Sequence, residues 1–374
     1  MKIKKILSLS PYNPYHTYSG ATTRIFYLNS VLAKRYKVFI VVRNEGDLTP
    51  TFDSIPIINS SNRIISMMNP VLMIRLLLLV WKEKIDLVYV NSFWLGLYAF
   101  WLRIFGVPYF VDEQNVEFIR FKRVGNPIWR IAKIYEYFLC RFAMGITCTS
   151  EVDRNFLINQ LGVVSSKIQV IRNGVDSKKY QLNPKAREKV RSELGIKDEQ
   201  VFYFNGHFKY APNIEALEHI LKYVVPVLQL HSKSVRLLIV GSGEIPEDLK
   251  DKLESYDFVD VVGFVEILED YISAADVCLV PLSSGGGTRI KIFEALRNGK
   301  YVISTPIGAE GIDVDFPNLK IAQLGKDFSD ALEKIIGKTD LVGREDILRM
   351  EKLIKPFEWE YIAGGINFEE TKSK

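Results

Sequence analysis

Two successive series of short apolar runs, separated by longer segments of helical period, extend through most of this chain. In the first series the strand-type runs read KIKKILSLS, YKVFIVV, IPIIN, IDLVYVN, PYFVDEQ, GITCTS and KIQVIRNG. Helical segments fall between them at residues 19–35, 70–84, 92–105, 127–142 and from Glu151 onward. Strands that alternate with helices form right-handed βαβ units, and hence a parallel sheet covered on both faces. The pattern therefore predicts an α/β fold with a doubly wound sheet.

The second series begins near residue 200 and repeats this pattern. Its strand-type runs are VFYFNGHF, VRLLIVGSGE, DVVGFV, VCLVPL, YVISTPIGAEG and LKIAQL, with helices at residues 212–228, after Pro246, at 267–274 and after a glycine-rich turn. A length of 374 residues also favours two domains over one. We expect two doubly wound, Rossmann-like domains facing each other across a cleft, residues 1–176 and 177–356. Residues 357–374 are expected to form a C-terminal helix that returns to the first domain.

Glycine recurs where the strands of the second series end. The positions are Gly206, Gly241, Gly243, Gly263 and the run Gly285, Gly286 and Gly287. Ligands of doubly wound sheets bind beyond the carboxyl ends of the strands, so this recurrence predicts a nucleotide site there. His207 and Lys209 follow the first of these glycines, where a cation can meet a diphosphate. A solvated loop lysine is the alternative interpretation of Lys209.

Residues 277–299, VCLVPLSSGGGTRIKIFEALRNG, combine a strand-type run, three glycines and a helical pattern. The glycines allow the backbone to approach a ligand, and a helix starting at Gly287 would point unpaired N–H groups at an anion. At about 100° per residue, Lys291 and Glu294 share the face of Gly287, whereas Arg289 lies about 140° from Glu294. This predicts a phosphate site, although an ordinary turn before a core helix fits the same pattern.

The loop after the first strand lacks such a run of glycines. The loop SPYNPYHTYSGATTR contains one glycine, Gly20, so it lacks the dinucleotide pattern G-x-G-x-x-G and disfavours a nicotinamide cofactor. Gly20 is either a point of close approach to a ligand or a plain loop residue. His16, in the same loop, either faces the substrate or lies on the surface.

The cysteines and histidines indicate neither disulfides nor a metal site. Cys140, Cys148 and Cys278 are widely spaced in apolar surroundings, which favours reduced core thiols and a cytoplasmic protein. The four histidines show no paired ligand spacing, so we expect no metal. The apolar run at the amino terminus ends at Pro11 without a small-residue cleavage site, and we interpret it as a strand and not as a signal peptide.

Positive charge is concentrated in the first half. Residues 1–176 contain 22 Lys and Arg against 12 Asp and Glu, whereas the remainder contains 27 against 32. No nucleic-acid module is recognisable, and the basic residues alternate with large apolar ones, notably in residues 70–84 and 118–141. This mixture suits peripheral contact with an anionic membrane, at the inner face of the cell membrane. Residues 70–84 are too short to span a bilayer, and a buried packing helix is the alternative for that segment.

The second half resembles the retaining, nucleotide-sugar-dependent glycosyltransferases of the family 4 type, which have the two-domain GT-B fold. The resemblance lies in RNGVD (172–176), NGHFKYAPNIEAL (205–217), LLIVGSGE (237–244), VVGFVEILEDYISAADVCLVPL (261–282) and SGGGTRIKIFEALRNGKYVISTPIGAEGI (284–312). The first half matches more loosely, through residues 11–24, 111–117 and 149–153. The resemblance implies that the second domain binds the sugar nucleotide and the first binds the acceptor.

The resemblance also implies individual roles. Glu294 matches the second glutamate of the family's E-x7-E motif and would hold the ribose, while Lys291 and Lys209 would stabilise the leaving diphosphate. The donor-binding set is Gly20, Gly206, His207, Gly241, Gly243, Gly263, Phe264, Gly285, Gly286, Gly287, Thr288 and Glu294, with the base near Gly263 and Phe264. On the acceptor side the resemblance places His16, Gln114 and Asn115.

Three positions depart from the family pattern. Gly286 stands where the first glutamate of E-x7-E would fall, so only its backbone N–H can contact the donor sugar. Gln114 stands where many relatives have histidine, which removes a titrating base. The first-domain phosphate loop reads Gly20-Ala21 instead of the frequent Gly-Gly.

We expect transfer of a sugar from a nucleotide-diphosphate sugar to a hydroxyl of a glycan or lipid-linked acceptor, in polysaccharide or glycolipid synthesis. By resemblance, the reaction proceeds on one face of the sugar and the leaving diphosphate assists the incoming hydroxyl. Protein cations would supply the stabilising charge, without a metal or other cofactor. One alternative is a sugar-nucleotide epimerase of the same architecture, although no acid–base pair is evident. The other is a non-catalytic sugar-nucleotide-binding subunit, for which Gly286 and Gln114 would be signs of lost catalysis.

Overall fold

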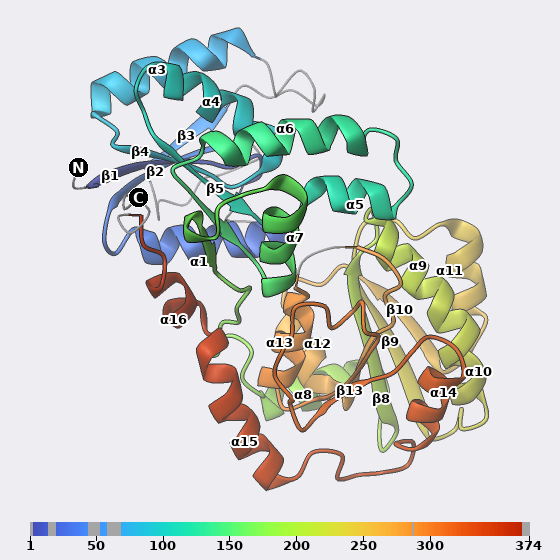
Figure 1. The fold of residues 1–374 in the computed structure, drawn as a ribbon. Coiled ribbons are helices and arrows are strands. Elements are labelled where there is room, and N and C mark those ends of the chain that lie inside the picture. Colours follow the sequence, from blue (N-terminus) through green and yellow to red (C-terminus); the bar gives the residue numbers. More distant parts are fainter. Residues whose placement is uncertain (1–2, 14–19, 44–52, 58–68, 286–287, 369–374) are drawn as a thin grey trace. The chain divides into compact units, whose positions relative to one another are not determined.

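The computed structural model describes residues 3–13, 20–43, 53–57, 69–285 and 288–368. It divides into two compact units (Figure 1). The first unit contains Met1–Asn173 together with Trp359–Lys374, and the second contains Gly174–Glu358. The predicted boundaries, after residues 176 and 356, lie close to these divisions. The cleft expected between the two domains stays a prediction.

The first unit is built on a seven-stranded parallel sheet in the order β3-β2-β1-β4-β5-β6-β7. The strands are β1 Lys5–Leu9, β2 Lys37–Arg43, β3 Asp53–Ile57, β4 Leu87–Val90, β5 Tyr109–Glu113, β6 Gly145–Cys148 and β7 Ile168–Val170. Leu7 of β1 pairs with Phe39 of β2 on one side and with Val88 of β4 on the other. The chain therefore reverses its direction of growth at β1, which is the defining feature of a doubly wound sheet.

Helices cover both faces of this sheet. They are α1 Gly20–Leu32, α3 Pro70–Glu83, α4 Gly96–Ile104, α5 Glu117–Arg123, α6 Trp129–Phe142 and α7 Glu151–Leu161. The α3, α4 and α6 helices lie side by side on one face, and α1 lies on the other (Figure 1). The predicted helix at residues 92–105 opens instead as a 3-10 turn, Phe93–Leu95, whose N-cap Ser92 accepts a hydrogen bond from the Trp94 N–H.

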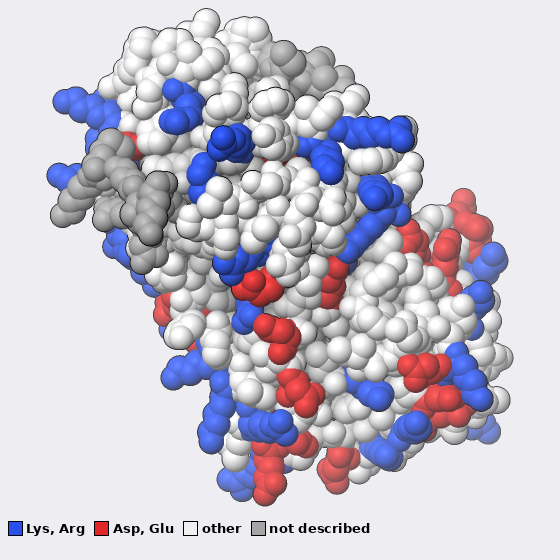
Figure 2. All heavy atoms as spheres, viewed as in Figure 1, with Lys and Arg blue, Asp and Glu red and all other residues white. Residues whose placement is uncertain are grey.

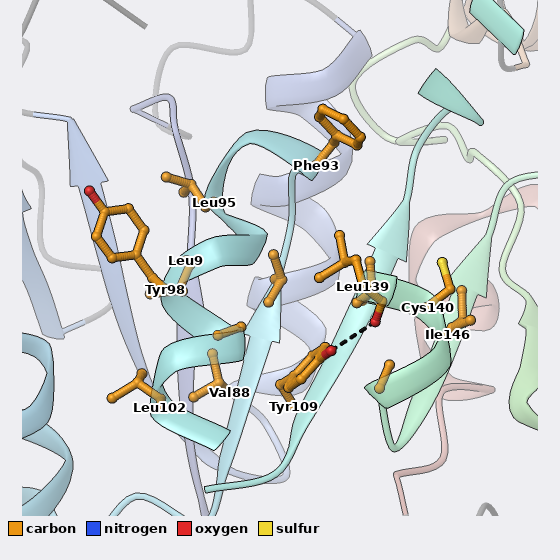
Figure 3. Close-up of a cluster of buried hydrophobic side chains, with 14 of the residues drawn as sticks. Leu9, Val88, Phe93, Leu95, Tyr98, Leu102, Tyr109, Leu139, Cys140 and Ile146 are labelled. Atoms are coloured by element: carbon orange, nitrogen blue, oxygen red, sulfur yellow. Dashed lines mark hydrogen bonds between the residues drawn. The ribbon is translucent and has the colours of Figure 1, made fainter. Parts of the chain in front are cut away.

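Local chemistry sets the ends of these helices. Asn69 caps α3 by accepting from the N–H groups of Val71 and Leu72 at 3.0 and 3.3 Å, and Pro70 occupies the first turn, where no N–H partner is needed. Where α4 and α6 pack on the sheet, the core contains Leu102 of α4 and Leu139 of α6 together with Leu9, Val88 and Ile146 of the strands (Figure 3). The Tyr109 hydroxyl donates to the Leu139 carbonyl at 2.8 Å, so this buried polar group is satisfied.

The end of the chain packs on the first unit. Helix α16, Trp359–Gly364, lies against α1, with the Trp359 and Tyr27 rings stacked at 5.3 Å. Arg35 donates to the Ile366 carbonyl at 2.9 Å. Phe368 is fully buried and its ring contacts Tyr89 and Phe110. The last helix thus contributes to the core of the unit in which the chain begins.

The second unit is built on a six-stranded parallel sheet in the order β10-β9-β8-β11-β12-β13. The strands are β8 Gln200–His207, β9 Val235–Ser242, β10 Val259–Gly263, β11 Val277–Val280, β12 Tyr301–Ser304 and β13 Leu319–Ile321. Its helices are α8 Pro184–Glu193, α9 Ala211–His219, α10 Val225–Gln229, α11 Glu247–Glu254, α12 Leu268–Ala274, α13 Ile290–Arg297, α14 Lys326–Glu333 and α15 Arg344–Ile354. The sequence interpretation did not identify α8, α14 or α15.

The helix predicted at residues 212–228 is present as helical backbone from Ala211 to Gln229, but it contains a wide π turn. Helix α9 ends at His219, a wide π turn occupies Ile220–Val224, and α10 follows. Pro226 lies in the first turn of α10, and a proline lacks the N–H that would continue the preceding ladder and crowds the carbonyl one turn before it. The wide turn relieves this conflict.

Candidate functional site

The carboxyl ends of β8 and β9 meet at two glycines. Gly206 pairs with Gly241, and a Cβ placed on Gly241 would lie 1.8 Å from the Gly206 carbonyl oxygen. Gly241 also has φ 157°, at the edge of the region that residues with a side chain rarely adopt. No other residue fits at this position. The two strand ends therefore form a bare backbone edge, as a diphosphate site requires.

His207 and Lys209 occupy the loop that follows β8. The His207 Nδ1 lies 2.9 Å from the Ser242 hydroxyl, which ties the imidazole to the end of β9. Lys209 is exposed, and its Cγ would be 3.2 Å from a Cβ on Gly243. Within the described ranges, no ion pair or hydrogen bond holds the Lys209 ammonium. Its stem therefore lies beside the β9 end while its charge is available to an anion.

Lys291 reaches the same place from α13. Its Nζ donates to the Asn205 carbonyl oxygen and lies 3.4 Å from the Asn213 Oδ1. Asn213, in α9, in turn donates to the His207 carbonyl at 3.0 Å. Burial, and then the charge of Arg289, lower the pKa of Lys291 to about 7, although Glu294 opposes this change. Near neutral pH this lysine therefore lacks a full charge until an anion arrives.

The predicted helix start at Gly287 was wrong. Helix α13 begins at Ile290, and Arg289 is its N-cap, with an extended backbone at φ −82° and ψ 104°. Gly286 and Gly287 lie outside the described residues. The helical-wheel argument that set Arg289 apart does not apply to a residue before the helix.

The Arg289 guanidinium lies beside the glycine-rich loop. Its Nη2 would be 2.6 Å from a Cβ on Gly285, and the Tyr210 hydroxyl would be 3.1 Å from the same point. Gly285 has φ 108°, which glycine adopts without strain. Arg289 Nη2 also lies 3.4 Å from the Ser284 carbonyl oxygen. Arg289 and Tyr210 are therefore site residues that the sequence interpretation missed.

Glu215 of α9 anchors the start of the same loop. Its Oε2 accepts hydrogen bonds from the hydroxyls of Ser283 at 2.9 Å and Ser284 at 2.6 Å. Both serines directly precede Gly285, so the carboxylate holds the loop where it leaves β11. No sequence signal links Glu215 to residues that lie 68 and 69 positions away.

Glu294 lies one turn beyond Lys291 on α13 and is buried. Burial raises the pKa of this carboxyl, while a hydrogen bond from Tyr180 and the charges of Lys179 and Lys291 lower it. Thr288, at the loop, is also buried. A carboxylate held in this way can accept hydrogen bonds from two vicinal hydroxyls of a ribose.

Gly263 and Phe264 lie at the end of β10, next to β9. Gly263 pairs with Val240, two residues before Ser242. The Phe264 side chain is 55% exposed, so this position at the end of β10 is reachable from solvent. The predicted donor-binding residues of the second unit thus come from the adjacent ends of β8, β9 and β10 and from the β11–α13 connection.

The predicted acceptor-side residues belong to the first unit. Gln114 follows β5, is half-buried, and donates from Nε2 to the Asn91 carbonyl at the end of β4, at 2.9 Å. Asn115 is half-buried in the same loop, and Gly20 is exposed at the start of α1. His16 lies outside the described residues.

A buried ion pair fixes the start of α1 behind this edge. The Arg24 guanidinium donates to both Asp112 oxygens, at 2.7 and 2.9 Å, and to the Ile171 carbonyl at 2.7 Å. Thr147 donates to Asp112 Oδ1 at 2.7 Å. The bidentate geometry and the additional bonds satisfy both charges without water. Sequence periodicity could not pair Arg24 with Asp112, which lies 88 positions away.

Two carboxyl groups share a second buried cluster. Glu136 accepts from the N–H groups of Glu117 and Phe118 at 2.9 and 3.0 Å, and so caps α5. Burial, and then the neighbouring charges of Glu136 and Glu117, raise the pKa of Glu113 well above its usual value. Burial also raises the pKa of Glu136, so both carboxyl groups favour their neutral forms. Cys140 lies 3.6 Å from Glu113 Oε1.

Family models match both units of the chain. Residues 18–179 match the model "Glycosyltransferase Family 4", and residues 199–337 match "Glycosyl transferases group 1". The first match extends to residue 179, just past the division between the units, and the two matches together cover most of the chain. The chain is a family 4 type glycosyltransferase. The expected family, enzyme class and fold of two Rossmann-like GT-B domains are confirmed.

Individual relatives of this glycosyltransferase were found in bacteria. The UDP-Gal:alpha-D-GlcNAc-diphosphoundecaprenol alpha-1,3-galactosyltransferase of Escherichia coli is 26% identical over 279 residues, which are 71% of this chain and 70% of the relative. The alpha-monoglucosyldiacylglycerol synthase of Streptococcus pneumoniae is 25% identical over 239 residues, 60% of this chain and 52% of the relative. Both names describe glycosyl transfer, and neither alternative function, epimerase or non-catalytic subunit, gains support.

Solved structures share the fold of the glycosyltransferase. Anabaena Alr3699/HepE in complex with UDP and glucose has a TM-score of 0.76 at 16% identity, covering 96% of this chain and 97% of that chain. Sucrose-phosphate synthase of Thermosynechococcus elongatus also has a TM-score of 0.76, at 18% identity and 96% coverage of both chains.

Two features are absent from the residues that the structure describes. In those parts of the chain, no helix combines the length and apolar character needed to cross a bilayer. Over the same ranges, no three His, Cys, Asp or Glu side chains are grouped to hold a metal ion.

Proposed function

We propose that the glycosyltransferase moves a sugar, with retention of anomeric configuration, from a nucleotide-diphosphate sugar to a hydroxyl of a glycan or lipid-linked acceptor. The unit of residues 174–358 binds the donor, and the other unit binds the acceptor. The observation that carries this proposal is the convergence of Lys291 on the bare backbone edge of Gly206 and Gly241. The name of the Escherichia coli relative, which includes a lipid diphosphate, supports the acceptor class.

Different donor-binding residues contact the ribose, the diphosphate and the base of the nucleotide. Glu294 accepts hydrogen bonds from the ribose hydroxyls, replacing its bond from Tyr180. The diphosphate lies against Gly206 and Gly241, where it meets the Lys291 ammonium. The base lies toward Gly263 and Phe264, at the end of β10, where the Phe264 side chain is 55% exposed.

Catalysis then consists of stabilising the charge that grows on the leaving diphosphate. Lys291 gains its proton as the diphosphate approaches, because the negative charge reverses the effect of burial. Lys209 adds a second cation from the β8–α9 loop. With glutamine at position 114, the leaving diphosphate oxygen accepts the proton of the acceptor hydroxyl as that hydroxyl attacks the same face of the sugar. Position 286 is a glycine, so no side chain at this position can contact the donor sugar.

We propose that no divalent metal or other cofactor takes part, because the two lysines supply the positive charge. Turnover is expected to be unchanged after treatment with EDTA and dialysis. Loss of turnover that Mg²⁺ or Mn²⁺ restores would contradict this.

We also propose a biological setting for the reaction. Three buried, unpaired cysteines are consistent with a reducing cytoplasm. The basic and aromatic first unit favours peripheral contact with the inner face of the cell membrane, and the names of the two relatives include lipids. Together these observations support a role in cell-surface polysaccharide or glycolipid synthesis.

Two measurements test the proposed reaction. Thermal unfolding with a panel of nucleoside diphosphates should identify one that stabilises the protein, by about 2.7 kcal/mol at 100 times its Kd. The matching nucleotide sugars are then incubated with lipid-linked acceptors, and the anomeric configuration of the product is read by NMR. Retained configuration is expected. An inverted product would refute the retaining mechanism, and the absence of stabilisation by any diphosphate would refute the donor site.

A further inference from the structure

Three neighbouring helices of the first unit expose large apolar side chains on their outer sides. On α3 these are Val71, Ile74, Leu78 and Trp81; on and after α4, Phe100, Ile104 and Phe105; on α6, Ile131, Ile134, Phe138 and Phe142. We call these eleven residues the outer apolar face. Individual exposed fractions reach 59% for Trp81, 62% for Ile134 and 72% for Ile104. Such a surface is much larger than the scattered exposed residues of an ordinary monomer.

The outer apolar face is continuous across the helices. The Trp81 ring of α3 meets the Phe105 ring at 6.4 Å. The Phe100 ring of α4 meets the Phe142 ring of α6 at 5.3 Å, and Phe142 stacks with Phe138 at 6.3 Å. These contacts join the three exposed stripes into one surface.

The stripes lie opposite the side chains that hold the helices to the core. On α3, Leu72, Leu76 and Val80 are buried, while the stripe on the other side is exposed. On α6, Leu139 and Cys140 are buried in the same way. The helix at residues 70–84 is therefore not buried all round, which excludes a purely internal packing role. Core packing uses one side of each helix and leaves the second apolar side without a partner among the described residues of this unit.

The charges exposed on these helices are positive. Arg75, Lys82, Arg103, Arg130 and Arg141 are exposed. The acidic residues of the three helices are Glu83, 3.8 Å from Lys5, and the buried Glu136. Figure 2 shows the corresponding surface as white with blue Lys and Arg. Over the second unit, red and blue are mixed (Figure 2).

We propose that the outer apolar face lies in the interface of an anionic lipid bilayer, with the surrounding Lys and Arg at the headgroups. An apolar helix face flanked by basic residues is the kind of surface that binds at this interface. A second copy of the chain would bring the same positive charges together, which disfavours a dimer through this face. The inference deepens the membrane contact of the proposed function by naming the surface, and vesicle binding tests it without any sugar transfer.

Binding of the full chain to vesicles is the main test. Sedimentation with phosphatidylglycerol-containing vesicles should show binding at low salt that weakens at high salt, and little binding to phosphatidylcholine alone. Ile134→Glu should lower the partition constant about 10- to 100-fold, because an inserted aliphatic side chain is lost and a negative charge is added. Leu230→Glu is the matched control, since Leu230 is 77% exposed in the second unit. Its binding should equal that of the wild type.

The basic residues are tested in the same assay. The double variant Arg130→Glu, Arg141→Glu should lose about 25-fold or more in binding to anionic vesicles, since each cation near such a surface contributes about fivefold. Lys233→Glu, an exposed lysine of the second unit, should change binding little. Quenching of tryptophan fluorescence by brominated lipid should fall in Trp81→Phe and persist in Trp359→Phe, whose ring is buried on α16.

Defined outcomes overturn the proposal. It fails if anionic vesicles do not bind the protein at low salt, or if Leu230→Glu weakens binding as much as Ile134→Glu. A concentration-dependent dimer that Ile134→Glu abolishes, without vesicle binding, would assign the face to a second copy. Stabilisation of Ile134→Glu by the nucleoside diphosphate would show that the variant is folded. Because vesicle binding requires no transfer, failure of the proposed reaction would leave this result standing.

Discussion

Among individual residues, Lys291 has the largest proposed role in the donor site, because it binds the diphosphate and stabilises its charge. Its neighbours Asn205 and Asn213 satisfy the ammonium without giving it a counter-charge, and burial lowers its pKa to about 7. Binding of an anion beside this lysine should therefore be coupled to the uptake of a proton by its amine.

Proton uptake on nucleotide binding is the expected consequence. At pH 8, Lys291 is mostly neutral in the free protein, so the protein should take up nearly one proton when it binds a nucleoside diphosphate. At about pH 6 the lysine is already charged, so the number of protons taken up should fall toward zero. Calorimetry in buffers with different ionisation enthalpies measures this number. Lys291→Met should abolish the uptake and lower kcat by about 10²–10³, whereas Lys334→Met, at an exposed lysine of the same unit, should do neither. Uptake that persists in Lys291→Met would assign the proton to another group.

Glu294 provides a separate prediction about affinity. Glu294→Ala removes the carboxylate proposed to hold the ribose, and the Kd for the nucleoside diphosphate should rise about 10- to 100-fold. Glu333→Ala, at an exposed glutamate of α14, serves as the control. Calorimetric titration measures both variants, and an unchanged Kd for Glu294→Ala would remove the ribose assignment.

At the level of elements, the connections between strands and helices determine the geometry of the donor site. Periodicity located the strand and the helix of residues 277–299, but it placed the helix start at Gly287, whereas α13 begins at Ile290. The extended Arg289 and the serines held by Glu215 set this connection. The serines depend on a carboxylate from a different helix, α9, which a local pattern cannot contain.

The α5–α6 pair provides a prediction about pH. Burial raises the pKa of Glu136 to about 8, against opposing hydrogen bonds from the Phe118 and Glu117 N–H groups, and the pKa of Glu113 is also raised. The folded state therefore binds more protons than the unfolded state above about pH 4.5. The stabilisation is fully present below that pH and is lost as the pH rises through about 8.

Glu113→Gln should flatten this pH dependence. The amide can still form a hydrogen bond with the Glu136 carboxyl group but no longer titrates, so the variant should gain stability relative to the wild type as the pH rises from 5 to 9. Chemical denaturation at several pH values measures the free energy of unfolding. Glu151→Gln, at an exposed glutamate of α7, is the control. Parallel curves for wild type and Glu113→Gln would contradict the buried proton.

Across the whole molecule, the last helix belongs to the unit in which the chain begins. Trp359 of α16 is only 3% exposed and stacks on Tyr27 of α1. Tyr361, two residues later on the same helix, is 68% exposed. The two aromatic residues therefore form a matched pair for testing whether α16 contributes to the core.

Trp359→Ala should destabilise the first unit by about 3–5 kcal/mol, because a large buried ring is replaced by a cavity. Tyr361→Ala should stay within about 0.5 kcal/mol of the wild type. Equilibrium unfolding in urea measures both. Equal effects of the two substitutions would show that α16 is not part of the core.

The sequence by itself determined the alternation of strands and helices, the two doubly wound sheets, the glycines at the strand ends and the family, because these are properties of neighbouring residues. Only the tertiary structure decided that Lys291 bonds to Asn205, that Glu215 holds Ser283 and Ser284, and that Arg24 pairs with Asp112. It also joined the exposed stripes of α3, α4 and α6 into one face. These features arise where elements distant in the chain pack together, and burial then sets which charges need partners and which pKa values shift.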